Sequence, residues 1–101
     1  QIVRGSNQEN AAYPCGLCAE RTALFYANAQ YPESAVLAIA IAAKNADGFL
    51  EKPITPCGAC RQALLETENR FQTKIKVYLY GTESVYRVDS IAELLPLQFV
   101  L

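Results

Sequence analysis

Residues 34–43 (SAVLAIAIAA) form an unbroken apolar run. Within the run, Leu37, Ile39 and Ile41 alternate with smaller residues that are mostly alanine, so an extended segment would have one bulky face and one small face. This pattern predicts a strand that is covered on both faces, with a helix packed closely on the small face. A buried helix is the alternative that the length of the run leaves open.

Two further segments have the alternation that is typical of strands. Residues 74–80 (KIKVYLY) alternate polar and apolar positions, and residues 85–88 (VYRV) follow a turn at 81–84. Residues 45–48 (NADG) predict a turn after the apolar run. Residues 1–5 predict the end of another strand, because an apolar pair is followed by a closing glycine.

Helix-forming composition predicts two main helices. The first covers about residues 17–29, which contain neither glycine nor proline, and the second about residues 57–69, after the rigid entry made by Pro53 and Pro56. Ser90 is predicted to cap a third, short helix. The resulting order is strand, helix, strand, helix, strand, strand and short helix. It predicts a three-layer α/β/α domain with helices on both faces of the sheet and at least one parallel crossover.

The composition limits the classes of function. The 101 residues are 51% hydrophobic, enough for one domain spanning residues 1–101 with its own core. Nine basic and ten acidic residues give a net charge of −1, which argues against a nucleic-acid partner because phosphate contacts need a basic surface. No apolar run reaches the roughly 20 residues of a membrane span, so no membrane partner is expected. We expect a cytoplasmic protein, since four cysteines without a secretory signal favour metal ligands over disulfides.

The four cysteines form two Cys-x-x-Cys pairs, Cys15–Cys18 and Cys57–Cys60. Such pairs bind zinc, because thiolates are strong, soft ligands. All four would make a closed structural site, but 38 residues separate the pairs, more than the 15–20 that are typical of such modules. The alternative is three ligands with an open fourth position, in which case Cys15 is a small buried hydrophobe.

Glu20 favours the open site. It lies two residues after Cys18, at the predicted start of the first helix. A carboxylate there is close to the metal and could exchange a proton with a zinc-bound water. Taken alone, Glu20 could equally serve only to complement the helix dipole.

At these residues the sequence resembles the cytidine deaminases of nucleoside salvage, specifically the small homotetrameric type. The similarity runs from about residue 5 to residue 99, and the Cys-x-Glu and Pro-Cys-x-x-Cys motifs are highly specific. The matching stretches are Asn7-x-Glu9-Asn10-Ala11, Tyr13-Pro14, Cys18-Ala19-Glu20-Arg21-Thr22-Ala23, Pro56-Cys57-Gly58-Ala59-Cys60-Arg61-Gln62 and, more weakly, Leu94-Leu95-Pro96-x-x-Phe99.

The resemblance implies a zinc-dependent hydrolase of pyrimidine salvage that converts cytidine or 2′-deoxycytidine to the uridine nucleoside and ammonia. It implies Cys18, Cys57 and Cys60 as ligands of Zn²⁺, with water as the fourth ligand. Zinc-bound hydroxide would attack C4 of the base, and Glu20 would carry its proton through N3 to the departing ammonia. Cys15 matches no ligand position.

The resemblance also implies the substrate contacts and the assembly. Asn7 and Glu9 would bind the ribose 3′-hydroxyl, backbone groups of Ala19 and Thr55 would hold the base, and Arg21 would donate hydrogen bonds to the ligand sulfurs. The expected assembly is a homotetramer. Relative to the family, the sequence lacks an opening helix and first strand, so the domain is expected to be incomplete at its N-terminus.

Two other functions remain open on the sequence alone. One is a related aminohydrolase acting on a cytosine-nucleoside antibiotic, such as a blasticidin S deaminase. The other is a structural four-cysteine zinc module that serves as an interaction domain. Release of ammonia from cytidine distinguishes the enzyme from the module.

Overall fold

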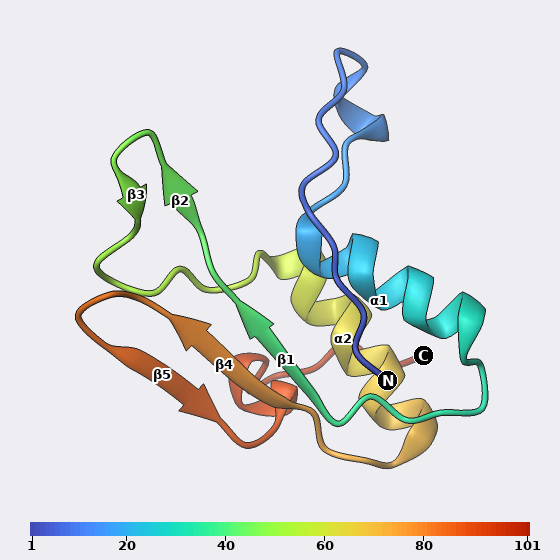
Figure 1. The fold of residues 1–101 in the computed structure, drawn as a ribbon. Helices are drawn as coiled ribbons and strands as arrows, with labels where there is room; N and C mark the ends of the chain where they lie inside the picture. Colours follow the sequence, from blue (N-terminus) through green and yellow to red (C-terminus); the bar gives the residue numbers. More distant parts are fainter. The chain divides into compact units, whose positions relative to one another are not determined.

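The computed structural model describes residues 1–101. The chain contains two compact units, and the first, Gln1–Ser34, is built around one helix. This helix, α1 (Ala19–Gln30), lies at the predicted place (Figure 1). The polar residues before it form a long loop that contains the 3-10 turn η1 (Tyr13–Cys15). A two-way backbone bridge between Gln8 and Leu17 closes this loop, with N–O distances of 2.8 and 2.9 Å.

The strand predicted for residues 1–5 is absent, and this prediction is wrong. The segment lies instead against α1, where Gly5 approaches the helix backbone closely. A Cβ atom at Gly5 would lie 2.7 Å from both the Ala19 carbonyl oxygen and the Ala23 nitrogen. The glycine therefore permits a tertiary contact that brings the following residues to the start of α1.

The second compact unit, Ala35–Leu101, contains a mixed three-stranded sheet in the order β1-β4-β5. Strands β1 and β4 pair in parallel, and β4 and β5 pair antiparallel. The predicted turn at 45–48 joins a small separate hairpin, and the predicted short helix is a 3-10 turn. The elements are β1 (Ala38–Ile41), β2 (Lys44–Asn45), β3 (Gly48–Phe49), α2 (Gly58–Phe71), β4 (Lys76–Tyr80), β5 (Val85–Val88) and η2 (Ile91–Leu94).

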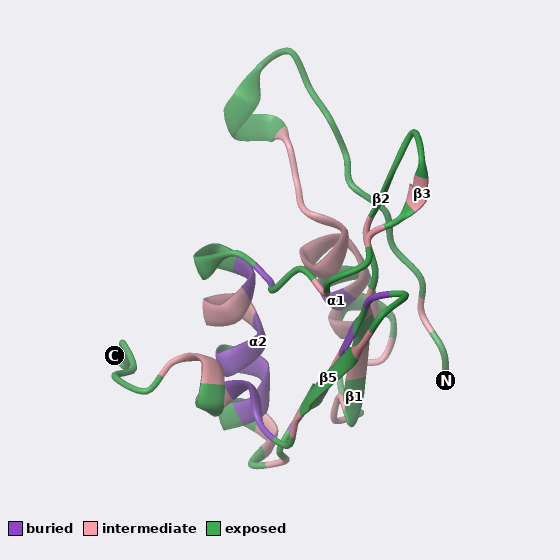
Figure 2. Cartoon of the chain, turned by 90° about the vertical axis from the view of Figure 1, so that its left-hand side faces the viewer, coloured by how far each residue is buried: buried purple, intermediate pink, exposed green.

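The core of this unit lies between α2 and one face of the sheet (Figure 2). The parallel pairing of β1 with β4 requires a crossover, which α2 provides, so the predicted α/β class is confirmed. Helices on both faces of the sheet remain a prediction. The buried apolar side chains of this unit are those of Cys60, Leu64, Leu65, Ile75, Val77, Leu79 and Ile91.

Within the second unit, strand β1 is covered on one face only, so nothing in this unit provides the cover predicted for its alanine face. Ala38 and Ala40 are exposed, whereas Ile39 and Ile41 are half-buried. The register places Ala38 beside exposed Lys76, on the face of the sheet opposite α2. The two alanines therefore do not contribute to the core of this unit, and only the isoleucine face of β1 does.

A buried carboxylate joins three parts of the second unit. Glu68, on α2, is only 7% exposed. Its oxygens accept hydrogen bonds from the Ile75 N–H (2.8 Å), the Ser90 hydroxyl (2.6 Å) and the Ile91 N–H (3.1 Å). Glu68 thereby connects α2 to the segment before β4 and to the start of η2.

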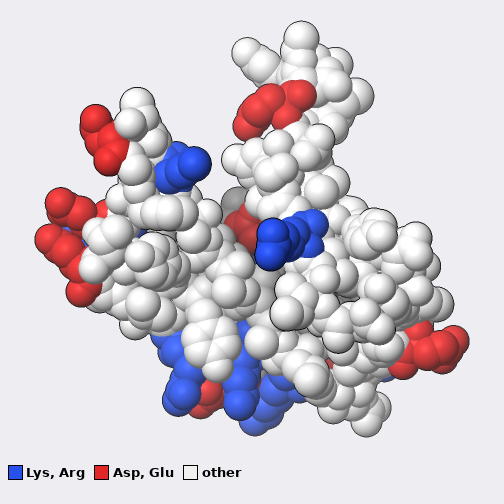
Figure 3. Space-filling view, viewed as in Figure 1, with Lys and Arg blue, Asp and Glu red and all other residues white.

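Charged side chains are unevenly distributed over the second unit. Lys and Arg gather at the bottom of the view in Figure 3, where β4 begins and β5 ends in Figure 1, with acidic atoms among them. The register contributes to this, because Arg87 pairs with Tyr78 and therefore shares a face with Lys76. Basic residues that are scattered in the sequence are thus closer in space. No helix of the structure combines the length and the apolar character needed to cross a membrane.

Candidate zinc and nucleoside site

Cys18 is the N-cap of α1, with extended backbone angles (φ −66°, ψ 151°). Its carbonyl oxygen accepts hydrogen bonds from the N–H (2.9 Å) and the hydroxyl (3.1 Å) of Thr22, which fix the first turn. Nη2 of Arg21 donates to the Cys18 Sγ at 3.5 Å. Cys18 is therefore held at the positive end of the helix dipole and beside the Arg21 guanidinium.

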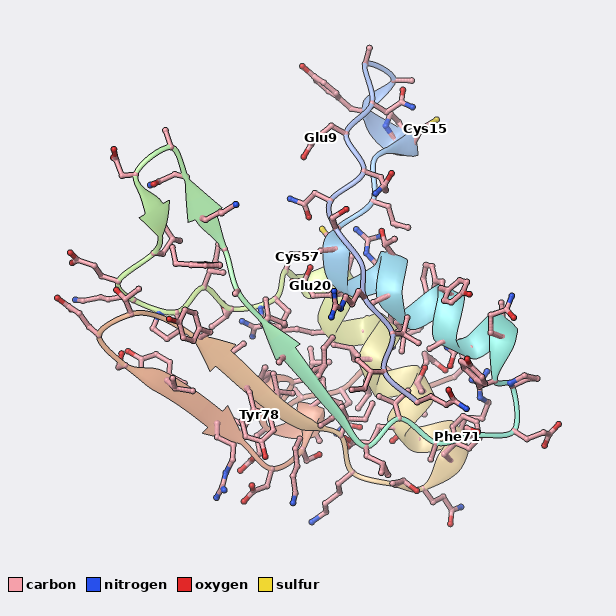
Figure 4. The ribbon with its side chains drawn as sticks, in the orientation of Figure 1. Glu9, Cys15, Glu20, Cys57, Phe71 and Tyr78 are labelled. Atoms are coloured by element: carbon pink, nitrogen blue, oxygen red, sulfur yellow. The ribbon has the colours of Figure 1, made fainter.

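Glu20 lies in the first turn of α1, two residues after Cys18, and is half-buried (Figure 4). It is the only acidic residue of that turn. The predicted position of Glu20 at the start of the first helix is confirmed. Its role as a proton carrier remains a prediction.

Asn7 binds the start of α1 from the preceding loop. Its Oδ1 accepts a hydrogen bond of 2.8 Å from the Ala19 N–H, which is one of the helix N–H groups without a partner inside the helix. Asn7 and Ala19, two of the four residues predicted to contact substrate, therefore contact each other. With Oδ1 occupied, the Asn7 amide group retains its Nδ2 donor for a ligand.

A hollow of about 200 Å³ lies between the loop and the start of α1. Four of the residues that line it were predicted as site residues: Asn7, Glu9, Cys18 and Arg21. Sequence reasoning missed the other three lining residues, which the bridge between Gln8 and Leu17 brings together: Gln8, Gly16 and Leu17. No local sequence signal indicates that Gln8 and Leu17 pair across the loop.

Cys57 and Cys60 lie at the start of α2 in the second unit. Cys57 is the exposed N-cap, with extended backbone angles (φ −66°, ψ 168°), and Cys60 in the first turn is fully buried. The buried Pro56 precedes the pair and fixes the chain before the helix begins. Thr55, predicted to hold the base, is an exposed residue of the preceding loop.

The set of side chains suited to hold a metal ion consists of Cys18, Cys57 and Cys60, each offering one sulfur. Three thiolates are soft donors that fit Zn²⁺, and the chain contains no histidine that could add a nitrogen ligand. Cys15 is outside this set. It lies exposed in η1 at the tip of the loop, so it is not the buried hydrophobe that the sequence suggested (Figure 4). None of the four cysteines forms a disulfide.

Comparison with known proteins supports a zinc-binding region in this chain. Residues 1–76 match the family model described as the cytidine and deoxycytidylate deaminase zinc-binding region. The chain belongs to the cytidine and deoxycytidylate deaminase family. The match covers the loop, both cysteine-bearing helix starts and Glu20, which are the parts described above.

Individual relatives extend the similarity of this deaminase-family chain almost to its end. It is 40% identical over 95 residues to a cytidine deaminase of Halalkalibacterium halodurans and 39% identical over 95 residues to one of Sporosarcina psychrophila. Each alignment covers 94% of the chain, but only 65% and 63% of the respective relatives. The chain thus spans just under two thirds of their length.

A solved structure shows the same fold. The crystal structure of a cytidine deaminase from Burkholderia pseudomallei matches 98% of the chain and 72% of its own length, with a TM-score of 0.77 and 36% sequence identity. The α/β fold of this deaminase-family chain is therefore shared with a solved member.

Proposed function

We propose that the chain catalyses the zinc-dependent hydrolysis of cytidine and 2′-deoxycytidine to uridine and 2′-deoxyuridine, with release of ammonia. One observation carries the proposal: a chain of this zinc-binding family places Glu20 in the first helical turn directly after Cys18. Bound zinc would supply a Lewis acid that lowers the pKa of water. The ligands would be the sulfurs of Cys18, Cys57 and Cys60.

Glu20 would carry the proton of the reaction. Hydrolysis adds a water oxygen to C4 of the base and expels the exocyclic amine, so one proton must leave the water and reach the departing nitrogen. A carboxylate can accept that proton and donate it later, a role that typically contributes a factor of about 10² to 10⁴ in rate. Glu20 is suited to this because its side chain is half-buried and lies in the first turn of α1, two residues after Cys18.

Asn7 and Glu9 would bind the sugar. A ribose hydroxyl both donates and accepts hydrogen bonds, and it would meet the Asn7 Nδ2 donor and a Glu9 carboxylate acceptor. The hollow that they line is smaller than the roughly 300 Å³ at the lower end of sites for whole ligands, which suits one moiety of a nucleoside.

The base would be held by backbone groups of Ala19 and Thr55. The Ala19 N–H already donates to Asn7, so a contact of this N–H with the base would compete with the Asn7 hydrogen bond. Arg21, which donates to the Cys18 sulfur, would offset the negative charge of three thiolates around one divalent ion.

The finer parts of the proposal come from the resemblance to the small deaminases. They are a homotetrameric assembly, a place in pyrimidine salvage and a cytoplasmic location. Nucleosides are small and uncharged, which agrees with a chain of net charge −1.

The decisive experiment measures metal content and product together. Purified chain containing zinc is incubated with cytidine, and uridine and ammonia are quantified by chromatography and a coupled ammonia assay. We expect equal amounts of the two products. Adenosine is the control substrate and should release no ammonia. Bound zinc without any uridine formation would contradict the enzymatic function and favour a structural zinc module.

A further inference from the structure

Arg61 joins two backbone carbonyls that are far apart in the sequence, those of Pro56 and Leu94. It directly follows the buried Cys60 and is itself half-buried. Its Nε donates to the Pro56 carbonyl oxygen at 2.8 Å, and its Nη1 donates to the Leu94 carbonyl oxygen at 3.0 Å. A guanidinium can do this because its donors are fixed in a planar fork.

The Pro56 carbonyl belongs to the peptide group that leads into Cys57. Because a peptide group is planar, holding its oxygen also fixes its nitrogen, which is the backbone nitrogen of Cys57. The direction of the Cys57 side chain then depends on where Arg61 holds this peptide. The backbone N–H of Arg61 also donates to the Cys57 carbonyl oxygen at 2.9 Å, so the residue contacts the turn from two sides.

The other partner, Leu94, lies in a segment with its own anchors. Leu94 ends η2, whose capping box joins Ser90 and Glu93. The buried carboxylate of Glu68 holds the start of η2, as described above. Arg61 therefore ties the cysteine turn to a segment that Glu68 also holds, seven residues further along α2.

Gln62 makes a second connection to the same segment. Its Nε2 donates to the Phe99 carbonyl oxygen at 3.3 Å. Two consecutive residues after Cys60 thus hold carbonyls of the C-terminal segment, separated from them in sequence by 33 and 37 positions. Through these two hydrogen bonds, the conformation of residues 90–99 affects the geometry of the Cys57–Cys60 turn.

We infer that Arg61 is a positioning residue that couples the C-terminal segment 90–99 to the Cys57–Cys60 turn and thereby raises the affinity of this turn for zinc. The inference rests on the proposed zinc site. Residues that orient metal ligands typically contribute a factor of about 10 to 100 in metal affinity. A purely structural arginine would change the stability of the unit and leave zinc affinity in the folded protein unchanged.

The first test compares three variants of the full chain: Arg61→Gln, Arg61→Lys and the control Arg87→Gln. Arg87 is an exposed arginine of β5 paired only with Asp89, and such surface pairs contribute little. Zinc affinity is measured by competition with a chromophoric chelator. We expect zinc binding about 10 to 100 times weaker in Arg61→Gln and no change in Arg87→Gln.

Arg61→Lys distinguishes the effect of the two guanidinium hydrogen bonds from the effect of the positive charge. Lysine keeps the positive charge but has a single nitrogen in place of the two divergent donors, so we expect its zinc affinity to stay lowered. With cobalt(II) as a probe, the thiolate absorption bands should change in both Arg61 variants and not in Arg87→Gln. Parent-like zinc affinity in either Arg61 variant would overturn the inference.

A double-mutant cycle tests the coupling from the other end. Glu93→Ala removes the carboxylate that accepts from the N–H groups of Asp89 and Ser90, and so loosens η2 without touching the turn. We expect weaker zinc binding in this variant and a less than additive effect when it is combined with Arg61→Gln. Fully additive effects, or no effect of Glu93→Ala, would show that no coupling exists.

A measurement without metal separates this inference from the proposed function. In the metal-free full chain, hydrogen exchange of the backbone N–H at position 61 should be faster in Arg61→Lys and Glu93→Ala than in the parent, and unchanged in Arg87→Gln. Failure of the parent to bind zinc would refute the proposed function, whereas unchanged amide exchange in both variants would refute the coupling.

Discussion

The carboxylate of Glu20 can be tested by a change that preserves its shape. In Glu20→Gln the amide cannot exchange a proton as a carboxylate does, so we expect deamination to fall by about 10² to 10⁴, with zinc content unchanged. Uridine formation and metal content are measured on the same sample. Glu33→Gln, at an exposed position beyond α1, is the matched control and should be fully active. Near-normal activity of Glu20→Gln would exclude the proton-carrier role.

Cys15 and Cys18 form a matched pair within one loop. Cys15 is exposed and outside the metal-binding set, so Cys15→Ser should retain both zinc and activity. Cys18→Ser replaces a soft thiolate by a poor zinc ligand and should lose most of the metal. Metal content per chain, measured by elemental analysis, distinguishes the two. If Cys15→Ser loses its zinc, the closed four-cysteine site returns as the better explanation.

At the scale of elements, Glu68 is expected to stabilise the second unit. Glu68→Ala would leave the buried N–H groups of Ile75 and Ile91 without their acceptor, which costs about 1–3 kcal/mol for each group. Glu68→Gln keeps one oxygen that can accept from both N–H groups, and its amide can donate to the Ser90 hydroxyl. We therefore expect this variant to lose only about 1 kcal/mol of the free energy of unfolding. Glu66→Ala, exposed on the same helix, should have little effect. The free energy of unfolding is measured in denaturant; equal losses for Glu68→Ala and Glu66→Ala would contradict the prediction.

Elements with local signals were predictable, and elements that depend on distant contacts were not. Helices α1 and α2 begin close to their predicted positions because composition and proline mark them. The covering of β1 depends on what packs on the sheet, which the apolar run by itself does not specify. The segment before Gly5 lies on α1 through a tertiary contact that no strand pattern could reveal.

The candidate site divides in the same way. Cys18, Glu20, Cys57 and Cys60 lie within short motifs whose spacing is visible in the sequence. The contact between Asn7 and Ala19 spans 12 positions, and that between Arg61 and Leu94 spans 33. These contacts depend on the folded path of the chain, so the sequence predicts the candidate ligands but not the groups that hold them in place.

At the scale of the whole molecule, the exposed apolar residues predict self-association. In the C-terminal segment, Leu97 is 94% exposed, and Phe99 and Val100 are each 64% exposed, which is unfavourable in water and typical of surfaces covered by another chain. The proposed homotetramer predicts a particle of four times the mass of one chain when measured by sedimentation equilibrium. A monomer at every concentration would contradict the tetramer.

A pair of adjacent substitutions tests whether the C-terminal segment takes part in this assembly. Leu97→Asp introduces a charge where an apolar side chain would be buried between subunits, so we expect the tetramer to dissociate at concentrations at which the parent remains assembled. Gln98→Asp adds the same charge one residue further, at an exposed polar position, and should leave assembly unchanged. Because Leu97 buries almost nothing in the single chain, Leu97→Asp should not lower the stability of the monomer itself. Equal assembly of both variants would place the subunit contacts elsewhere on the molecule.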